Sequence, residues 1–216
     1  MQNIKEFITQ PLNFGVSCLN YLQDHITNQQ TPEVHEGVKI TLEEREEKMS
    51  SEDLITSKNY PLEIHYVTTK DGYILKLYRI PGSKNEKKLE KIVQKQAVLF
   101  VHGVIDSSDG LLSNDEDKCL PYILANLGYD IWLGNSRGNK HSRNHISIKP
   151  EEQEFWNFSF HEMGLYDIPA FIDHIISENS FSEKIIYIGH SQGTAQVHCA
   201  LSENYEYMKA KIKLYI

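Results

Sequence analysis

The stretch that decides the fold is Lys184-Ile185-Ile186-Tyr187-Ile188-Gly189-His190-Ser191-Gln192-Gly193-Thr194. Its β-branched apolar first half predicts a buried strand, and residues 194–201 are compatible with a helix. A strand, a tight turn and a helix in this order are typical of a nucleophile elbow, in which a serine hydroxyl projects above the strand ends. The stretch therefore predicts Ser191 as a nucleophile, with an ordinary Gly-Ser turn as the alternative.

The residues beside Ser191 fit the steric demands of such an elbow. Gly189 and Gly193 leave room where a Cβ atom would collide with neighbouring backbone. His190 completes the turn, and we expect its side chain to point away from the Ser191 hydroxyl. A helix that begins here directs its amides and its dipole at the same spot, which favours a developing oxyanion.

Working outward from the elbow, a second apolar strand over residues 96–101 runs into His102-Gly103-Val104. In an open α/β sheet, ligands bind beyond the carboxyl ends of the strands, where this loop and the elbow would meet. We therefore expect the backbone amides of Val104 and Gln192 to form an oxyanion hole. Losing one such donor typically lowers the rate by ~10²–10³-fold. The alternative is a glycine-containing loop that only turns the chain.

The other elements predict an α/β domain over residues 51–216. A hairpin is expected from Glu63–Thr69 and Tyr73–Ile80 around Asp71-Gly72, a strong hairpin signal. Further strands are predicted over 129–134 and 211–216, and helices over 51–55, 118–126 and 163–176. Because strands alternate with helices, we expect an open, mostly parallel sheet headed by the antiparallel hairpin.

Residues 1–50 predict a separate amphipathic and polar extension. Apolar positions on both sides of Pro11 fit two short amphipathic helices, and residues 43–47 form an acidic run. Such helices could contact a lipid surface or pack on the domain, and both interpretations stay open.

Composition excludes several classes of partner. Lys and Arg total 22 and Asp and Glu total 30, giving a formal net charge of −8. This sign argues against nucleic acid and against anionic lipid headgroups, but it would not repel a neutral apolar substrate. Cys18, Cys119 and Cys199 lie far apart and form no C-x-x-C pair, so neither a disulfide framework nor a metal site is expected. No secretory signal or transmembrane run is seen, which leaves the compartment undetermined with an intracellular default.

Six stretches together resemble one known family. They are residues 59–61 with 68–75 and 79–81, 101–103 with 106–108, 134–139, 154–159 with 162–163, 166–170 and 189–194. The combination resembles the acid lipases, the α/β-hydrolase family of lysosomal acid lipase, gastric lipase and the steryl ester hydrolases. The resemblance covers about residue 51 to the end. It implies the α/β-hydrolase fold and hydrolysis of triacylglycerols or steryl esters through an acyl-serine at Ser191, without metal or cofactor. It also implies a lysosomal or secreted location.

The resemblance implies a partial domain, truncated before the last strands and the lid. The family's triad Asp and His lie after later strands, beyond residue 216. His190 is expected to point away, and His198 lies two helical turns from Ser191, about 10 Å along the axis. We interpret His102 and His161 as packing residues, so the second and third triad members stay unassigned.

Three functions are consistent with the sequence. The first is a serine ester hydrolase of lipid esters that is incomplete within these 216 residues. The second is an inactive hydrolase-like interaction protein, and the third is a thioesterase-type serine hydrolase acting on soluble acyl esters.

Overall fold

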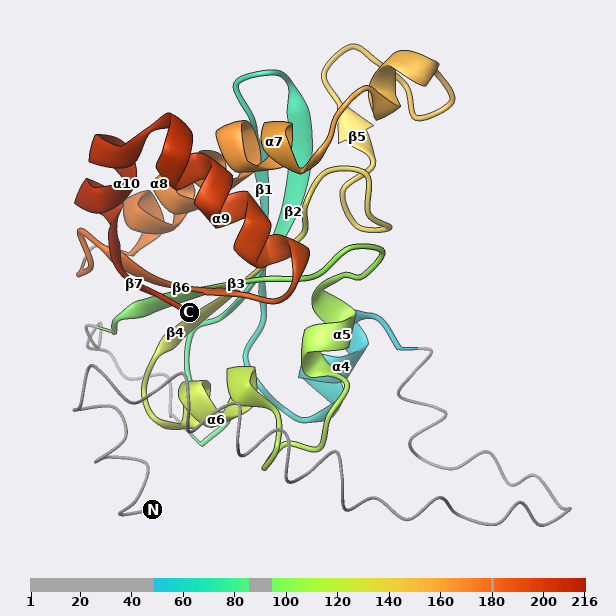
Figure 1. Ribbon diagram of the computed structural model, residues 1–216. Coiled ribbons are helices and arrows are strands. Elements are labelled where there is room, and N and C mark those ends of the chain that lie inside the picture. Colours follow the sequence, from blue (N-terminus) through green and yellow to red (C-terminus); the bar gives the residue numbers. More distant parts are fainter. Residues whose placement is uncertain (1–48, 86–94, 180) are drawn as a thin grey trace, which may run out of the picture. The chain divides into compact units, whose positions relative to one another are not determined.

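The computed structural model describes residues 49–85, 95–179 and 181–216, and all of them belong to one compact unit. The predictions for residues 1–48, two amphipathic helices and an acidic run, lie outside the described residues. Within the described part, seven strands form one sheet in the order β1-β2-β4-β3-β6-β7, with β5 paired to β2 (Figure 1). The strands are β1 (Glu63–Thr68), β2 (Tyr73–Ile80), β3 (Ala97–Val101), β4 (Asp130–Gly134), β5 (Asn144–His145), β6 (Ile185–Gly189) and β7 (Ile212–Tyr215).

The sheet has an antiparallel head and a parallel body. β1 pairs with β2, and β2 with β4, in antiparallel register, whereas β4, β3, β6 and β7 are parallel neighbours. Gly72 closes the predicted hairpin with φ of 99°, a conformation that suits glycine, and its N–H donates to the Thr69 carbonyl at 3.0 Å. The predicted parallel sheet headed by a hairpin is therefore confirmed.

Helices cover both faces of this sheet. One face is covered by α8 (Ile168–Glu178), α9 (Gln192–Glu203) and α10 (Tyr205–Lys211), the other by α4 (Ser51–Ser57), α5 (Ser108–Leu112) and α6 (Leu120–Asn126) (Figure 1). In β3, Leu99 and Val101 pack with the first layer, and Val98 and Phe100 with the second. All five residues of β3 are buried, which explains its uninterrupted apolar sequence.

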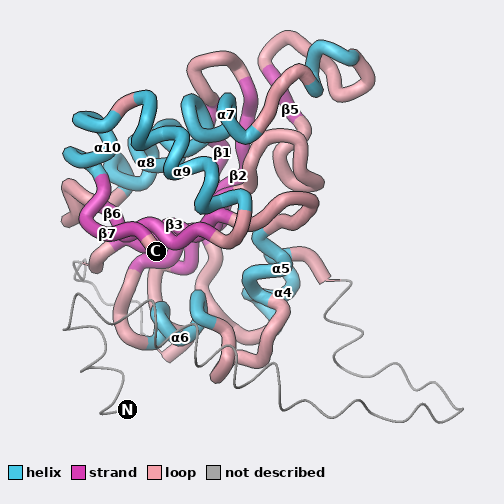
Figure 2. The backbone as a smooth tube through the Cα atoms, viewed as in Figure 1, coloured by secondary structure: helices cyan, strands magenta, loops and turns pink. Residues whose placement is uncertain are grey.

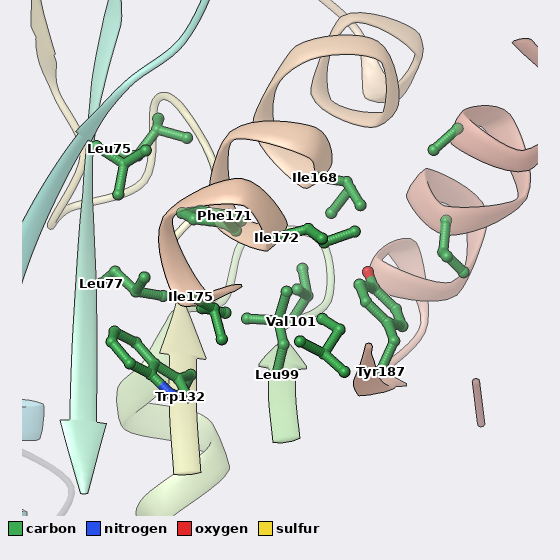
Figure 3. Packing of buried hydrophobic residues seen from close by; sticks show 14 of the residues in the cluster. Leu75, Leu77, Leu99, Val101, Trp132, Ile168, Phe171, Ile172, Ile175 and Tyr187 are labelled. Atoms are coloured by element: carbon green, nitrogen blue, oxygen red, sulfur yellow. The ribbon is translucent and has the colours of Figure 1, made fainter. Parts of the chain in front are cut away.

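The layer of α8 shows how the core is packed. Phe171, Ile172 and Ile175 project from α8 toward Leu99 and Val101 at the centre of the sheet (Figure 3). Burial of each such side chain contributes about 1.5–3 kcal/mol. Val197 and Ala200 of α9 pack in the same layer, so this core also holds the helix that begins at the elbow.

The helix predicted over residues 163–176 is present and contains one π-helical turn. The segment consists of α7 (Phe160–Glu162), one π-helical turn, η2 (Met163–Asp167), and α8. Pro169 has no N–H to donate to the carbonyl four residues earlier, and Ile168 donates instead to Met163, five residues back. The predicted helix is therefore confirmed, and the proline accounts for the π-helical turn that periodicity did not indicate.

Several short elements were not predicted. Residues 106–117, for which no element was predicted, contain α5, and β5, η1 (Gln153–Trp156) and α10 are also additional (Figure 2). Apart from α10, each has five residues or fewer. Periodicity cannot identify elements of that length, because a helical or alternating pattern needs more positions.

Candidate active site

Ser191 occupies a strained turn between β6 and α9. Its backbone has φ of 50° and ψ of −109°, which a residue with a Cβ atom rarely adopts. It is the residue that precedes the first turn of α9, and it is exposed. Strain of this kind costs about 1–3 kcal/mol and is concentrated at functional sites. The chain therefore holds this serine at the surface in an unfavourable conformation.

The two flanking glycines are required by backbone contacts. A Cβ built on Gly189 would lie 2.7 Å from the amide nitrogen of Thr194, and one on Gly193 would lie 2.4 Å from the carbonyl oxygen of Val101. Backbone atoms cannot rotate away as a side chain can. The expected collisions are therefore present at both positions.

Hydrogen bonds fasten the turn to the sheet and to the helix. The His190 N–H donates to the Val101 carbonyl at 2.9 Å, and the Gly193 N–H donates to the His190 carbonyl at 2.9 Å. From within the core, the Tyr187 hydroxyl donates to the Gly193 carbonyl at 2.7 Å. Burial raises the pKa of Tyr187 well above its usual value, so this hydroxyl stays protonated. The elbow is thus held from both sides.

The loop after β3 lies against this elbow. Val101 pairs with Gly189, so the two chains leave the sheet side by side. The Cβ position of Gly103 is 3.0 Å from Nδ1 of His190 and 3.3 Å from Cβ of Ser191. Val104 and Ile105 follow at the surface, and Ile105 has φ of 51°, a strained value for a β-branched residue.

The amides of Val104 and Gln192 have free donor capacity. Within the described residues, neither N–H donates a hydrogen bond to another protein group. Gln192 is the first residue of α9, where an amide has no partner inside the helix. Both amides thus remain open to an acceptor from outside.

The histidines weighed as possible bases in the sequence each have other contacts in the structure. Burial lowers the pKa of His102, and both its ring nitrogens have hydrogen-bond partners. Nδ1 of His161 lies 3.2 Å from Sγ of Cys199, and His198 stacks edge-on against Tyr215. In the described part of the chain, no hydrogen bond joins the Ser191 hydroxyl to a histidine or a carboxylate.

Three aspartates that could have supplied an orienting carboxylate are engaged elsewhere. Asp130 binds Arg79, Asp167 binds Arg137, and Asp173 accepts from Tyr207 at 2.6 Å. Among the described residues, no group of three or more His, Cys, Asp or Glu side chains is arranged to hold a metal ion. No helix in the same residues has the length and apolar character needed to cross a membrane.

Sequence reasoning missed a buried charge network beside the site. The Arg137 side chain is almost fully buried between Asp71 and Asp167, with its guanidinium 4.0 Å from the ring centre of Tyr73. Its Nε donates to Asp167 at 2.8 Å, and its backbone N–H donates to the same carboxylate at 3.0 Å. Burial raises the pKa of Asp167, an effect that Arg137 opposes. The sequence feature that could have indicated this network is an arginine within a loop of small polar residues at the end of a strand.

Two family models match this sequence. One, described as "Partial alpha/beta-hydrolase lipase region", matches residues 51–115, and the other, "alpha/beta hydrolase fold", matches residues 96–213. Together they cover the sheet, the loop that carries Val104 and the elbow at Ser191.

Curated proteins with similar sequences carry lipase names. Lipase member K of Mus musculus is 44% identical over 170 residues, which is 79% of this chain and 42% of that protein. Gastric triacylglycerol lipase of Mus musculus is 46% identical over 160 residues, 74% of this chain and 40% of that protein. Lipase 1 of Drosophila melanogaster is 43% identical over 162 residues, 73% of this chain and 34% of that protein. The chain thus spans well under half the length of these relatives.

Proposed function

The chain belongs to the lipase family of α/β-hydrolases, and from that premise we propose that it acts as a serine ester hydrolase with Ser191 as nucleophile. The observation that carries the proposal is the exposed, positive-φ turn at Ser191, set against the Gly103 loop. An ordinary turn does not need a strained serine between two glycines that cannot be replaced. The strain is explained if the hydroxyl has to reach a substrate carbonyl.

The reaction would proceed in two steps. The Ser191 oxygen attacks the carbonyl carbon of an ester, and the negative charge that develops on the carbonyl oxygen is stabilised by the N–H groups of Val104 and Gln192. The alcohol leaves with a proton, and an acyl-serine remains. Water then attacks the acyl group, which releases a carboxylic acid and restores the serine.

Both steps require a general base. The base takes the proton of the Ser191 hydroxyl and later that of the attacking water. The described histidines do not make this contact, so we propose that the base and its orienting carboxylate come from outside the described residues. This agrees with relatives that are more than twice as long as the matched segment.

For the substrate we propose a neutral lipid ester, a triacylglycerol or a steryl ester. One relative is named a triacylglycerol lipase, and a net charge of −8 does not repel an uncharged lipid. Val104 and Ile105 expose apolar surface beside the nucleophile, which supports contact with a lipid surface there. The chemistry needs neither a metal nor a cofactor.

Chemical rescue tests the proposal on this chain. Added imidazole can act as a general base, so we expect it to accelerate hydrolysis of p-nitrophenyl butyrate and to leave an acyl group on Ser191, seen by mass spectrometry. Ser191→Ala measures hydrolysis by imidazole alone and should show no adduct. Equal rates for the two proteins, without an adduct, would refute the nucleophile and favour an inactive interaction protein.

The same assay separates an ester hydrolase from a thioesterase. The two alternatives differ in whether the Ser191-dependent rate is larger for an oxygen ester or for a soluble thioester with the same acyl chain. A preference for an emulsified triacylglycerol or steryl ester supports the lipase assignment. A preference for the soluble thioester contradicts it.

A further inference from the structure

We propose that His102 is a positioning residue for the oxyanion hole, because it sets the orientation of the peptide group that joins Gly103 to Val104. The inference rests on the proposed function of Ser191. It concerns a side chain that the sequence indicated only as a packing residue.

The partners of His102 determine its tautomer. The backbone N–H of Ser136 donates to Nε2 at 3.1 Å, and the Asn139 side-chain amide lies 2.9 Å from the same atom. Because a backbone N–H can only donate, Nε2 must be the unprotonated acceptor. Nδ1 therefore carries the proton, and it donates to the carbonyl oxygen of Gly103 at 2.7 Å.

This hydrogen bond acts on the neighbouring amide. The Gly103 carbonyl and the Val104 N–H belong to one planar peptide group, and the described residues contain no cis peptide bond. In a trans peptide the two groups point in opposite directions. By holding the carbonyl toward its ring, His102 keeps the Val104 N–H directed away from it. The Cβ position of Gly103 is 3.3 Å from Cβ of Ser191, so this peptide group lies next to the nucleophile.

The loop needs such a restraint. Gly103 gives the backbone unusual freedom to rotate, Val104 is 57% exposed, and Ile105 is fully exposed with φ of 51°. Side-chain packing therefore does little to hold these residues. An oxyanion hole works only if its donors are oriented before the charge develops.

His102 is itself firmly held. Its side chain is buried. Its partners Ser136 and Asn139 flank Arg137 in the sequence, and Arg137 is bound to Asp71 and Asp167. The buried charge network thus supports the loop that fixes the histidine. Protonation of Nε2 would remove both of its acceptor contacts.

Two substitutions separate positioning from packing. The side-chain amide of Asn reaches the place of Nδ1, so His102→Asn can still donate to the Gly103 carbonyl. The amide of Gln reaches the place of Nε2, so His102→Gln keeps the contacts to Ser136 and Asn139 but loses that donor. The measurement is the imidazole-assisted acylation of Ser191 by p-nitrophenyl butyrate, resolved into the maximal rate and KM.

We expect His102→Gln to lower the maximal rate with little change in KM, approaching the ~10²–10³-fold loss typical of a removed oxyanion donor. His102→Asn should retain most of the rate, whatever stability it loses. The matched control is His174→Asn, which removes the contact of 3.0 Å between His174 and His65 away from Ser191 and should leave the rate unchanged.

The outcomes are distinguishable from failure of the proposed function. If the unmodified chain shows no Ser191-dependent acylation, the proposed function fails and this inference falls with it. If the unmodified chain is acylated and His102→Gln is acylated as fast, the inference alone is overturned. It is also overturned if both His102 variants lose rate in proportion to their loss of thermal stability.

Discussion

Gly193 lies so close to strand β3 that a Cβ atom on it would stand 2.4 Å from the carbonyl oxygen of Val101. The same carbonyl accepts the N–H of His190 at 2.9 Å, and Val101 is the last residue of β3 before the loop that carries Val104. One carbonyl therefore joins the sheet, the turn and the start of α9.

Replacing Gly193 by Ala should displace α9 and the turn together. We expect Gly193→Ala to lower the free energy of unfolding by about 1–3 kcal/mol, as overpacking does, and to abolish imidazole-assisted acylation of Ser191. The control is Gly128→Ala: Gly128 has φ of 91° and nothing within 4 Å of its Cβ position, so Ala there strains the backbone without overpacking and should leave acylation of Ser191 intact. Urea unfolding and mass spectrometry measure the two effects. Normal acylation of Gly193→Ala would show that the contact is not needed.

The strain at Ser191 has a measurable consequence for stability. Both Ser191→Ala and Ser191→Gly remove the nucleophile, but only glycine accepts φ of 50° without strain. We expect Ser191→Gly to be more stable than Ser191→Ala by about 1 kcal/mol, because the relief of about 1–3 kcal/mol exceeds the entropy cost of glycine.

The same pair of substitutions at Ser177, an exposed residue of α8, is the control for this comparison. There Ala should be the more stable by about 1 kcal/mol, because the backbone is helical. Urea unfolding of all four proteins gives the two differences. If the same substitution, Ala or Gly, gave the more stable protein at both positions, Ser191 would not be strained.

Local sequence signals predicted much of this fold. Asp71-Gly72 indicated the hairpin, the apolar run of β3 indicated a strand buried on both faces, and residues 184–194 indicated the elbow. In each case the cause is local, because a turn conformation or a hydrophobic pattern is determined by neighbouring residues.

What could not be predicted depends on contacts between distant parts of the chain. Asp71 was interpreted as a turn residue, yet its carboxylate binds Arg137, 66 residues away. The tautomer of His102 depends on Ser136, 34 residues away. Neither contact leaves a periodic or compositional trace. The carbonyl contact of Gly193 was predicted only as a general need for space, without its partner on β3.

Removing the charge of Arg137 should be strongly destabilising. Arg137→Met leaves Asp167 fully buried without its charged partner, and we expect a loss of about 3–5 kcal/mol in the free energy of unfolding. Arg137→Lys should retain only part of this free energy of unfolding, because an ammonium cannot make the forked contacts to two carboxylates.

The control for Arg137 is Lys84→Met, which breaks the partly exposed pair between Lys84 and Glu116 and should change stability by about 0–1 kcal/mol. Chemical denaturation at neutral pH compares the variants. If Arg137→Met were no less stable than Lys84→Met, the buried network would not contribute to the stability of the fold.

His102 should contribute a loss of stability on mild acidification. Burial lowers its pKa below the value of about 6.5 that it has in the unfolded chain, so between these two values the unfolded chain binds more protons. The free energy of unfolding therefore decreases as pH falls through this window, by at most about 1.4 kcal/mol per pH unit for this one group. His174, whose pKa burial and His65 also lower, adds to the same trend.

The carboxylates do not produce this trend. Burial opposes ionisation of Asp71 and Asp109, but hydrogen bonds from Arg137 and His141 respectively outweigh it and lower both pKa values. Their stabilising effect is present above about pH 3.9 and is lost only at lower pH. Asp167 has the opposite effect, because burial raises its pKa to about 6 and its protonation favours the folded state as pH falls through that value. The difference between a histidine variant and the unmodified chain, measured by denaturant titration between about pH 7 and pH 4.5, therefore isolates that histidine. We expect His102→Asn to flatten this dependence and His174→Asn to flatten it less. An unchanged slope for His102→Asn would mean that burial does not lower the pKa of His102 in the folded chain.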